Sequence, residues 1–326
     1  MLEVRDLSVG FPTQVPGRLL TVLQGVNLSL ADGEALGLVG ESGSGKSMTV
    51  RSILRLLPRR AVTTGDIRFR GKDVMRFGAG DLTHYRGHDT GTIFQDPRAH
   101  INPLQTIGSC LTEAVICHKM MSKDAARKQA IQLLYDVGIR DPERRLAQYP
   151  HQLSGGLLQR VMIVAALMTK PSLLLADEIS TALDVTVQSD VMAILNDLRR
   201  DQRLGMIFIT HDLDLAAAVT DRLAVMYAGT VVEAGKSSKV IRAPKHPYTA
   251  ALMASRPSLT EVRKLTTIPG RPISASEAGV GCVFATRCRH TTELCRTSRP
   301  LLKEVGDRQV ACHLSETLTL ASEATL

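Results

Sequence analysis

One stretch of eight residues constrains this chain more than any other. Gly40-Glu41-Ser42-Gly43-Ser44-Gly45-Lys46-Ser47 fits the pattern G-x-x-x-x-G-K-[ST] at every fixed position. The apolar run 35–39 predicts a buried strand before it, and residues 48–54 have helical spacing without Gly or Pro. Backbone N–H groups of such a loop can point inward at a phosphate, beside the positive end of the following helix. The stretch therefore predicts a nucleotide site in an α/β fold rather than a glycine-rich turn that binds nothing.

Two side chains of this loop suit a triphosphate and its metal ion. Lys46 is expected to reach the β- and γ-phosphates. The Ser47 hydroxyl is expected to hold Mg²⁺. The loop thus predicts ATP with Mg²⁺ as the ligand.

The composition limits what else the chain can be. Its 326 residues suffice for one large core, or for one core with a smaller appended unit. The formal charge of +8 suits nucleic acid, anionic lipid or phosphate ligands, but the 3% aromatic content and the lack of Trp argue weakly against a base-stacking surface. The longest strongly apolar stretch, 161–168, is too short to cross a bilayer, and the N-terminus lacks the apolar segment of a signal peptide. We expect a cytoplasmic protein whose membrane role depends on a partner.

Two alternating runs precede the loop. Residues 2–9 and 22–30 alternate enough to predict strands of a small antiparallel sheet. Phe11 follows the first run, and its ring is a candidate for stacking on the nucleotide base. A core Phe on a small sheet is an equally good interpretation.

Polar side chains follow three apolar strands in the rest of the chain. Gln95 comes after the strand at 91–94, Asp177 and Glu178 end the run 172–178, and His211 follows 206–210. At that sheet edge, where open α/β sheets bind ligands, Gln95 could contact Mg²⁺ or the attacking water. Asp177 suits Mg²⁺ coordination through water, and Glu178 suits polarising the attacking water. His211 could hydrogen-bond the γ-phosphate and hold the water and Glu178 in register. A lone His is more often a bystander, but two strand ends that bring Asp-Glu and His to one sheet edge argue against that interpretation.

The region between these strands has a helical pattern. Ser122 is a plausible N-cap of a helix that Gly138 ends. Leu153-Ser154-Gly155-Gly156-Leu157-Leu158-Gln159-Arg160 begins a further helix that runs to Lys170. Because Ser154 caps this helix and two glycines leave its N–H groups unobstructed, its start predicts a second anion-binding end.

Together these motifs resemble the ATP-binding subunits of ABC transporters. The resemblance implies a RecA-like mixed sheet core, an antiparallel β subdomain and a helical subdomain at about 96–170. It identifies 40–47 as the Walker A loop, Gln95 as the Q-loop residue, 153–160 as the signature motif and Asp177 as the end of Walker B. It further implies that Glu178 is the catalytic glutamate, that His211 is the switch histidine and that Phe11 is the base-stacking aromatic. Nucleotide contacts are also implied for Met48, Ser154, Gly155, Gly156, Gln159 and the D-loop residue Asp184.

Further residues resemble the peptide/nickel branch of ABC importers. They are Asp96-Pro97, 101–103, 106–108, His246-Pro247-Tyr248-Thr249 and Ile268-Pro269-Gly270. The expected organisation is an ATPase domain at 1–242 and an oligopeptide-transporter C-terminal extension at 243–326. The implied function is ATP hydrolysis that powers uptake of di- or oligopeptides, with nickel or another small solute as the alternative cargo.

The resemblance also implies partners and a location. Two transmembrane permease subunits, a related but different second ATP-binding subunit and an extracytoplasmic solute-binding protein are expected, at the cytoplasmic face of the plasma membrane. Each ATP would lie between the Walker A loop of one chain and the signature helix of the other. The segment after Gln95 is expected to contact the permease. Ile179-Ser180 stands where the family usually has Pro-Thr, so the turn after Glu178 is expected to be looser.

The C-terminal region carries four cysteines within thirty-one positions, Cys282, Cys288, Cys295 and Cys312. Their spacing alone does not choose a metal, because thiolates suit both zinc and iron–sulfur clusters. Resemblance to an extension that carries a [4Fe–4S] cluster makes this cluster the first interpretation, zinc the second and unliganded thiols the third. The arginines 287, 289, 296 and 299 would offset a cluster's charge, or would form a solvated basic face. Cys110 and Cys117 are expected to be buried small apolar residues.

Two rival functions belong to other classes. A soluble ABC ATPase acting on DNA or ribosomes would need a long coiled-coil insertion or two cassettes, whereas this chain has one Walker A motif and no long heptad segment. A non-hydrolytic scaffold with a redox-sensing tail conflicts with the presence of Glu178 and His211. We therefore expect an enzyme that contacts no nucleic acid.

Overall fold

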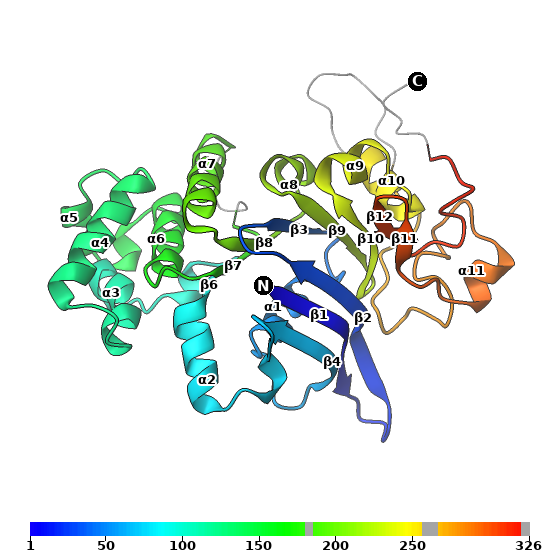
Figure 1. Cartoon of the computed structure of the whole chain (residues 1–326), viewed down its shortest axis with the longest axis horizontal. Helices are drawn as coiled ribbons and strands as arrows, with labels where there is room; N and C mark the ends of the chain where they lie inside the picture. Colours follow the sequence, from blue (N-terminus) through cyan, green and yellow to red (C-terminus); the bar gives the residue numbers. More distant parts are fainter. Residues whose placement is uncertain (180–184, 256–266, 321–326) are drawn as a thin grey trace. The chain divides into compact units, whose positions relative to one another are not determined.

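The computed structural model describes residues 1–179, 185–255 and 267–320, and Figure 1 shows the order of their elements. The chain divides into two compact units. The first comprises residues 1–30, 36–75 and 209–326, and the second comprises 31–35 and 76–208. Each unit is built from strands and helices, so the α/β class predicted from the sequence is confirmed.

An antiparallel sheet forms the N-terminal part of the first unit, in the strand order β2-β1-β4-β5. Its strands are β1 (Leu2–Pro12), β2 (Leu19–Leu30), β4 (Val62–Phe69) and β5 (Lys72–Asp73). Leu2, Val4, Leu7 and Val9 of β1 are all buried, and shifts in the pairing register occur near Leu7. The small antiparallel sheet predicted from alternation is therefore present.

The same unit contains five strands of a mixed sheet, in the order β11-β12-β10-β9-β3. They are β3 (Ala35–Val39), β9 (Arg222–Tyr227), β10 (Thr230–Lys236), β11 (Lys303–Val305) and β12 (Arg308–Val310). β3 pairs with β9 in parallel, whereas β9 and β10 form an antiparallel hairpin turned at Ala228 and Gly229, both at positive φ. Every residue of β3 is buried, as expected for a strand covered on both faces.

The C-terminal region completes this sheet and its core. β12 pairs with β10 in the register Glu233↔Val310. Tyr248 and Phe284 are buried with Tyr227 of β9, and the ring centroids of Tyr227 and Tyr248 are 4.6 Å apart. The proposed extension thus packs into the core of the first unit. The helices of this unit are α1 (Lys46–Ile53), α8 (Leu213–Val219), α9 (Ser237–Arg242), α10 (Pro247–Ala254) and α11 (Glu293–Thr297).

Parallel strands and a group of helices make up the second unit. β6 (Thr90–Ile93) pairs in parallel with β7 (Leu173–Asp177), which lies next to β8 (Gly205–Thr210). β8 ends just beyond the boundary of this unit, and the short turn η1 (Val74–Arg76) spans another boundary. The helices and turns are α2 (Ala79–His84), η2 (Tyr85–Asp89), η3 (Arg98–His100), α3 (Ile107–Cys117), α4 (Lys123–Asp136), α5 (Pro142–Leu146), η4 (Pro150–Gln152), α6 (Gly155–Leu167) and α7 (Val185–Gln202).

Helices α3 to α6 gather into one group (Figure 1). α4 begins and ends where the sequence predicts, because the Ser122 hydroxyl accepts from the Ala125 N–H at 3.3 Å and Gly138 has φ +73°. The expectation that Cys110 and Cys117 are buried is wrong. Cys110 is half-buried and Cys117, at the end of α3, is exposed.

No helix in the described parts of the chain combines the length and the apolar character needed for a membrane span.

Candidate functional site

The phosphate loop joins β3 to α1, and its backbone can be built only with glycine at two positions. Gly40 has φ +150°, and a Cβ there would lie 2.2 Å from the Met226 carbonyl oxygen. Gly45 has φ +106°, and a Cβ there would lie 2.6 Å from a methyl carbon of Leu23. Gly43 also has a positive φ but faces open space. Glycine therefore serves both the left-handed conformation and the close packing of this loop.

Lys46 places its ammonium group on the loop itself. The side chain is buried, and Nζ donates to the carbonyl oxygens of Gly40 at 2.8 Å and Glu41 at 3.0 Å. The N-cap of α1, Gly45, supplies no side chain to cap the helix. A cation and a helix start thus face the same loop, which is the arrangement that binds phosphate. Ser47 and Met48, the second and third residues of α1, are half-buried.

Asp177, Glu178 and Gln95 lie at one end of the parallel pair in the second unit. β6 and β7 pair in the register Ile93↔Ala176, so the residues that follow both strands emerge at the same edge. Gln95 Nε2 donates to Glu178 Oε2 at 2.6 Å. Glu178 has φ +49°, a conformation that is uncommon for a side chain of this kind. Strand pairing therefore brings together three residues that the sequence predicts at this edge.

His211 follows β8 and is exposed. It lies in the first unit with the phosphate loop, whereas Gln95 and Glu178 lie in the second. The next residue, Asp212, caps α8 by accepting from the N–H groups of Asp214 and Leu215, each at 3.0 Å. This cap fixes the backbone beside His211.

The predicted signature segment forms a capped helix start in the second unit. Ser154 Oγ accepts from the Leu157 N–H at 3.4 Å, and a Cβ on Gly155 would meet no atom within 4 Å. The start of α6 is therefore open, as anion binding requires. Gln159 differs, because it is fully buried and neither polar atom of its side chain has a hydrogen-bond partner among the described residues. The nucleotide contact of Gln159 stays a prediction.

Phe11 lies in β1 opposite Leu20 and is half-buried, so it is not a core residue of the antiparallel sheet. Its ring remains a candidate for base stacking. Ile179 is buried, so an apolar side chain rather than Pro follows Glu178. The D-loop residue Asp184 lies outside the described residues.

Arg287 connects the C-terminal region to the phosphate loop. Its guanidinium donates to both Glu41 oxygens, at 2.7 and 3.2 Å, and to the Tyr227 hydroxyl at 3.2 Å. The Tyr248 hydroxyl accepts from the Glu41 N–H at 2.9 Å. Burial disfavours the charge, but the hydrogen bonds to Glu41 and Tyr227 outweigh it and raise the pKa of Arg287. The interpretation of a solvated basic face is therefore wrong for Arg287, whose side chain is 4% exposed.

Sequence reasoning did not find this contact. Glu41 is an acid in a loop suited to anions, which signals that a cation must neutralise it. The chain has 40 lysines and arginines, and no spacing in the sequence selects Arg287 among them.

All four C-terminal cysteines line one cavity of about 10 Å³, together with His246, His290 and His313. Burial raises the pKa of Cys282 to about 11, with a smaller effect of the neighbouring thiols, and also raises the pKa of Cys288 and Cys312. Thiolates gathered here would repel each other, so a bound cation is needed to hold them deprotonated.

The surroundings of the sulfurs provide a test of which metal group fits. The Leu314 N–H points at Cys312 Sγ at 3.4 Å, and backbone N–H groups of Phe284 and His290 face Cys282 and Cys288. Within the described residues, no three of the four sulfurs lie within 4.8 Å of one another. Four thiols in one cavity are donors that suit zinc and an iron–sulfur cluster alike.

Comparisons with known proteins agree with this geometry. Residues 23–181 match the ABC transporter family model, and residues 232–295 match the oligopeptide/dipeptide transporter C-terminal region. The chain is 42% identical over 311 residues to the oligopeptide transport ATP-binding protein OppD of Bacillus subtilis, covering 94% of this chain and 86% of the relative. This chain belongs to the ATP-binding subunits of ABC transporters.

Other relatives point the same way. The dipeptide transport ATP-binding protein DppD of Bacillus subtilis is 44% identical, with 90% of this chain and 88% of the relative covered. OppD of Salmonella typhimurium is 41% identical, with 96% and 93% covered. Among solved structures, the ATP-binding cassette MJ0796, a dimer in a post-hydrolysis state bound to ADP and Pi, matches with a TM-score of 0.65, 27% identity, and 73% of this chain and 99% of that chain covered. The ABC ATPase fold inferred from the motifs is therefore confirmed.

Proposed function

We propose that this ABC subunit hydrolyses ATP to power uptake of di- or oligopeptides through a membrane importer. The observation that carries the proposal is the phosphate loop, with Lys46 folded onto the carbonyl groups of Gly40 and Glu41. The match of residues 232–295 to the oligopeptide/dipeptide transporter C-terminal region supports peptides as the cargo.

The described residues divide the chemistry between them. Lys46 binds the β- and γ-phosphates, while Ser47 and Asp177 hold Mg²⁺, which offsets the charge of the phosphate oxygens when it is bound. Glu178 accepts a proton from the attacking water. The hydrogen bond from Gln95 Nε2 to Glu178 Oε2 holds the two side chains together and leaves the carboxylate further lone pairs for the water. Gln95 orients the water or the metal, and His211 holds the γ-phosphate.

We assign the remaining nucleotide contacts to two protomers. Phe11 stacks on the base, while Ser154, Gly155 and Gly156 present the open start of α6 to the triphosphate of a partner chain. Asp184 contributes at the same interface, as the family resemblance implies. The partner is a related but different ATP-binding subunit.

The remaining partners are two permease subunits and an extracytoplasmic binding protein, and the chain acts at the cytoplasmic face of the plasma membrane. We propose that the segment after Gln95 contacts the permease. Leu104 is 85% exposed there, which is unusual for so large an apolar side chain.

We further propose that Cys282, Cys288, Cys295 and Cys312 hold a [4Fe–4S] cluster, with zinc as the alternative. The common cavity and the N–H groups directed at sulfur support a thiolate-bound metal group. Anaerobically purified protein should contain iron and sulfide in equal amounts and lose both in Cys288→Ser. Cys117→Ser, at an exposed cysteine, is the matched control and should keep the cluster. Stoichiometric zinc in place of iron would contradict the assignment.

The main function is tested with the chain assembled with its permease and partner ATPase. Lys46→Ala should abolish tight ATP binding, whereas Glu178→Gln should keep binding and lower turnover roughly 10²- to 10⁴-fold. Glu143→Gln, at an exposed position in α5, is the control and should leave both unchanged. ATP turnover that survives Glu178→Gln would rule out the catalytic assignment.

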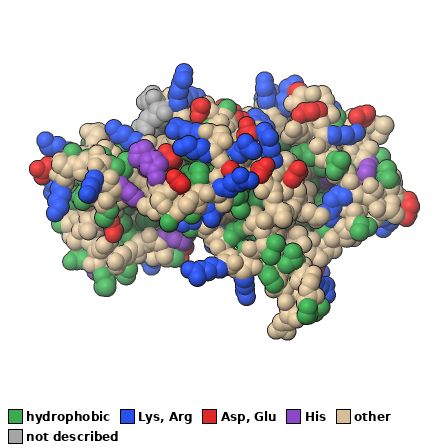
Figure 2. Space-filling view, turned by 60° about the horizontal axis from the view of Figure 1, so that its bottom comes forward, with side chains coloured by type: hydrophobic (Ala, Val, Ile, Leu, Met, Phe, Trp, Pro, Cys, Tyr) green, Lys and Arg blue, Asp and Glu red, His purple; other side chains and the backbone are tan. Residues whose placement is uncertain are grey.

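Two experiments separate the rival functions. Labelled dipeptide, but not labelled nickel, should accumulate in vesicles that contain the whole importer and ATP. A soluble ATPase acting on nucleic acid would instead be stimulated by DNA or RNA. Figure 2 shows acidic side chains interspersed among the Lys and Arg side chains on the face that it draws.

A further inference from the structure

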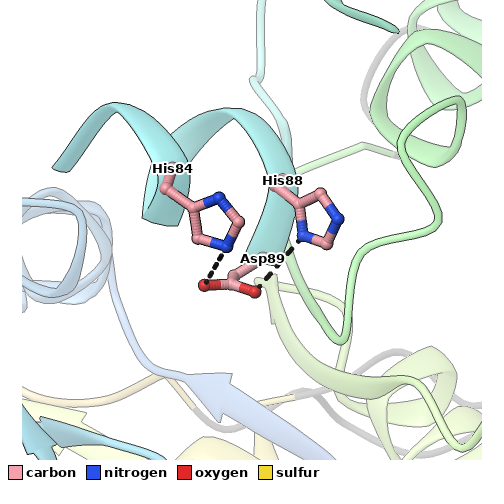
Figure 3. Close-up of side chains that lie close together, drawn as sticks. All are labelled: His84, His88 and Asp89. Atoms are coloured by element: carbon pink, nitrogen blue, oxygen red, sulfur yellow. Dashed lines mark hydrogen bonds and ion pairs between the residues drawn. The ribbon is translucent and has the colours of Figure 1, made fainter. Parts of the chain in front are cut away.

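A second group of metal-ligand side chains lies far along the chain from the cysteines. His84, His88 and Asp89 point toward one another where α2 passes into η2 in the second unit (Figure 3). His84 Nε2 is 3.7 Å from Asp89 Oδ2, and His88 Nδ1 is 3.4 Å from Asp89 Oδ1. One ligand atom from each residue lies within 4.8 Å of the others.

The backbone holds these side chains in place. η2 is a π-helical turn, and histidines four positions apart project from the same side of it. Their rings are stacked, with centroids 4.6 Å apart and 16° between their planes. The Asp89 carbonyl oxygen accepts from the Ser172 N–H at 3.0 Å and from its hydroxyl at 3.2 Å, which ties the turn to the start of β7. Tyr85, the first residue of η2, is buried and anchors the turn.

The distances suit a shared ion better than two hydrogen bonds. Good hydrogen bonds between nitrogen and oxygen are about 2.7–3.2 Å long, and both contacts to Asp89 exceed that range. Bonds of about 2.0–2.2 Å from nitrogen or oxygen to tetrahedral zinc place the ligand atoms about 3.3–3.6 Å apart. The His88 separation of 3.4 Å lies within that range, and the His84 separation of 3.7 Å, to the other oxygen of Asp89, is slightly longer.

We propose that His84, His88 and Asp89 form a binding site for a divalent transition cation of the zinc type. Two imidazoles and one carboxylate are ligands that such ions prefer. Both histidines are exposed, so the ion enters from solvent and keeps water at its remaining positions. The site lies at the start of β6 and β7, and Gln95 and Glu178 follow the opposite ends of the same strands. Its occupancy therefore stiffens the turn before β6 without touching the residues that act on ATP.

The test is calorimetric titration of Zn²⁺ into the full chain with its cysteines intact. The double variant His84→Asn/His88→Asn should lose one zinc site, or weaken it at least about tenfold, and keep every other site. His118→Asn is the matched control, because this exposed histidine is near Gly87 but outside the group. Equal zinc stoichiometry and affinity in the double variant and the wild type would overturn the proposal.

A local readout separates this site from the cysteines. Zn²⁺ should protect His84 and His88 from acylation by diethyl pyrocarbonate, as measured by peptide mass mapping, and should leave His118 reactive. Asp89→Asn should reduce that protection while MgATP binding stays unchanged. Protection that persists in Asp89→Asn, or that is equal at His118, would contradict a three-ligand site.

Discussion

At the scale of single residues, Arg287 and Glu41 join parts of the chain that lie 246 positions apart. Both side chains are mostly buried, at 4% and 21% exposure, so each needs the other to offset the cost of losing water. Arg287 immediately precedes Cys288, and Glu41 is part of the phosphate loop. One side chain therefore links the cysteine site to the nucleotide site.

Replacing Arg287 should show this link. Arg287→Met leaves the Glu41 carboxylate without its cation, so we expect a loss of unfolding free energy on the order of 2 kcal/mol and several-fold weaker ATP binding. Urea unfolding and a nucleotide titration measure the two effects. Arg287→Lys should restore part of both, because the charge returns without the two-pronged geometry.

The control for Arg287→Met is Arg271→Met. Arg271 also pairs with a glutamate of the C-terminal region, Glu277, but in an exposed position. Its loss should change neither stability nor ATP binding measurably. If both variants bound ATP like the wild type, Arg287 would serve only to anchor the C-terminal region.

At the scale of elements, the conformation of the phosphate loop requires glycine at particular positions. Gly40 and Gly43 both have positive φ, but only Gly40 also packs against the backbone, at the Met226 carbonyl. The two positions thus separate backbone strain from steric overlap.

Alanine at these two positions should give unequal results. Gly40→Ala introduces both backbone strain and overlap with the Met226 carbonyl. We expect it to lower the unfolding free energy by about 3 kcal/mol or more, or to give no soluble protein. Gly43→Ala introduces backbone strain alone and should lower the unfolding free energy by about 1–2 kcal/mol. Urea unfolding compares the two variants. Equal stability of Gly40→Ala and Gly43→Ala would mean that the loop does not approach Met226.

Helix α10 depends on an unprotonated histidine at its start. His246 Nδ1 accepts from the Tyr248 N–H at 3.0 Å, and burial lowers the pKa of His246 to about 3. Between pH 3 and 6.5 the unfolded chain therefore binds a proton that the folded chain excludes. This contribution to stability is complete above pH 6.5 and is lost as the pH falls.

The unfolding free energy should accordingly fall by about 1.4 kcal/mol from His246 alone between pH 7.5 and 5.5. His246→Asn keeps a capping acceptor but cannot titrate. The unfolding free energy of this variant should therefore fall by about 1.4 kcal/mol less than that of the wild type over the same pH range. Urea unfolding at both pH values gives the comparison. Parallel pH profiles would show that His246 is not buried as a neutral ring.

At the scale of the whole molecule, the residues proposed for catalysis are distributed over both units. Lys46 and His211 belong to the first unit, and Gln95, Asp177 and Glu178 belong to the second. The proposed signature helix start, at Ser154, would serve a partner chain. Hydrolysis should therefore depend on assembly.

ATP turnover per chain should rise roughly tenfold or more when the partner ATPase is added, since the partner supplies the second set of phosphate donors. Phosphate release at increasing partner concentration measures this dependence. ATP binding to Lys46, by contrast, should already occur in the isolated chain. Turnover that is independent of the partner would contradict the shared site.

The sequence by itself determined the phosphate loop, the capped start of α6, and the strands that lead to Gln95, Asp177 and His211. These features depend on local order, because a loop, a strand end or a cap is specified by residues close together in the chain. The buried state of Gln159 and the exposure of Cys117 were not visible, since periodicity does not show which neighbours cover a helix.

Only the tertiary structure decided the contacts between distant residues. Arg287 against Glu41, Gln95 against Glu178, and the cavity shared by four cysteines all depend on how elements pack. Spacing along the chain carries no information about which of many charged side chains loses its water and must find a partner. Burial makes that choice, and burial is a property of the folded chain.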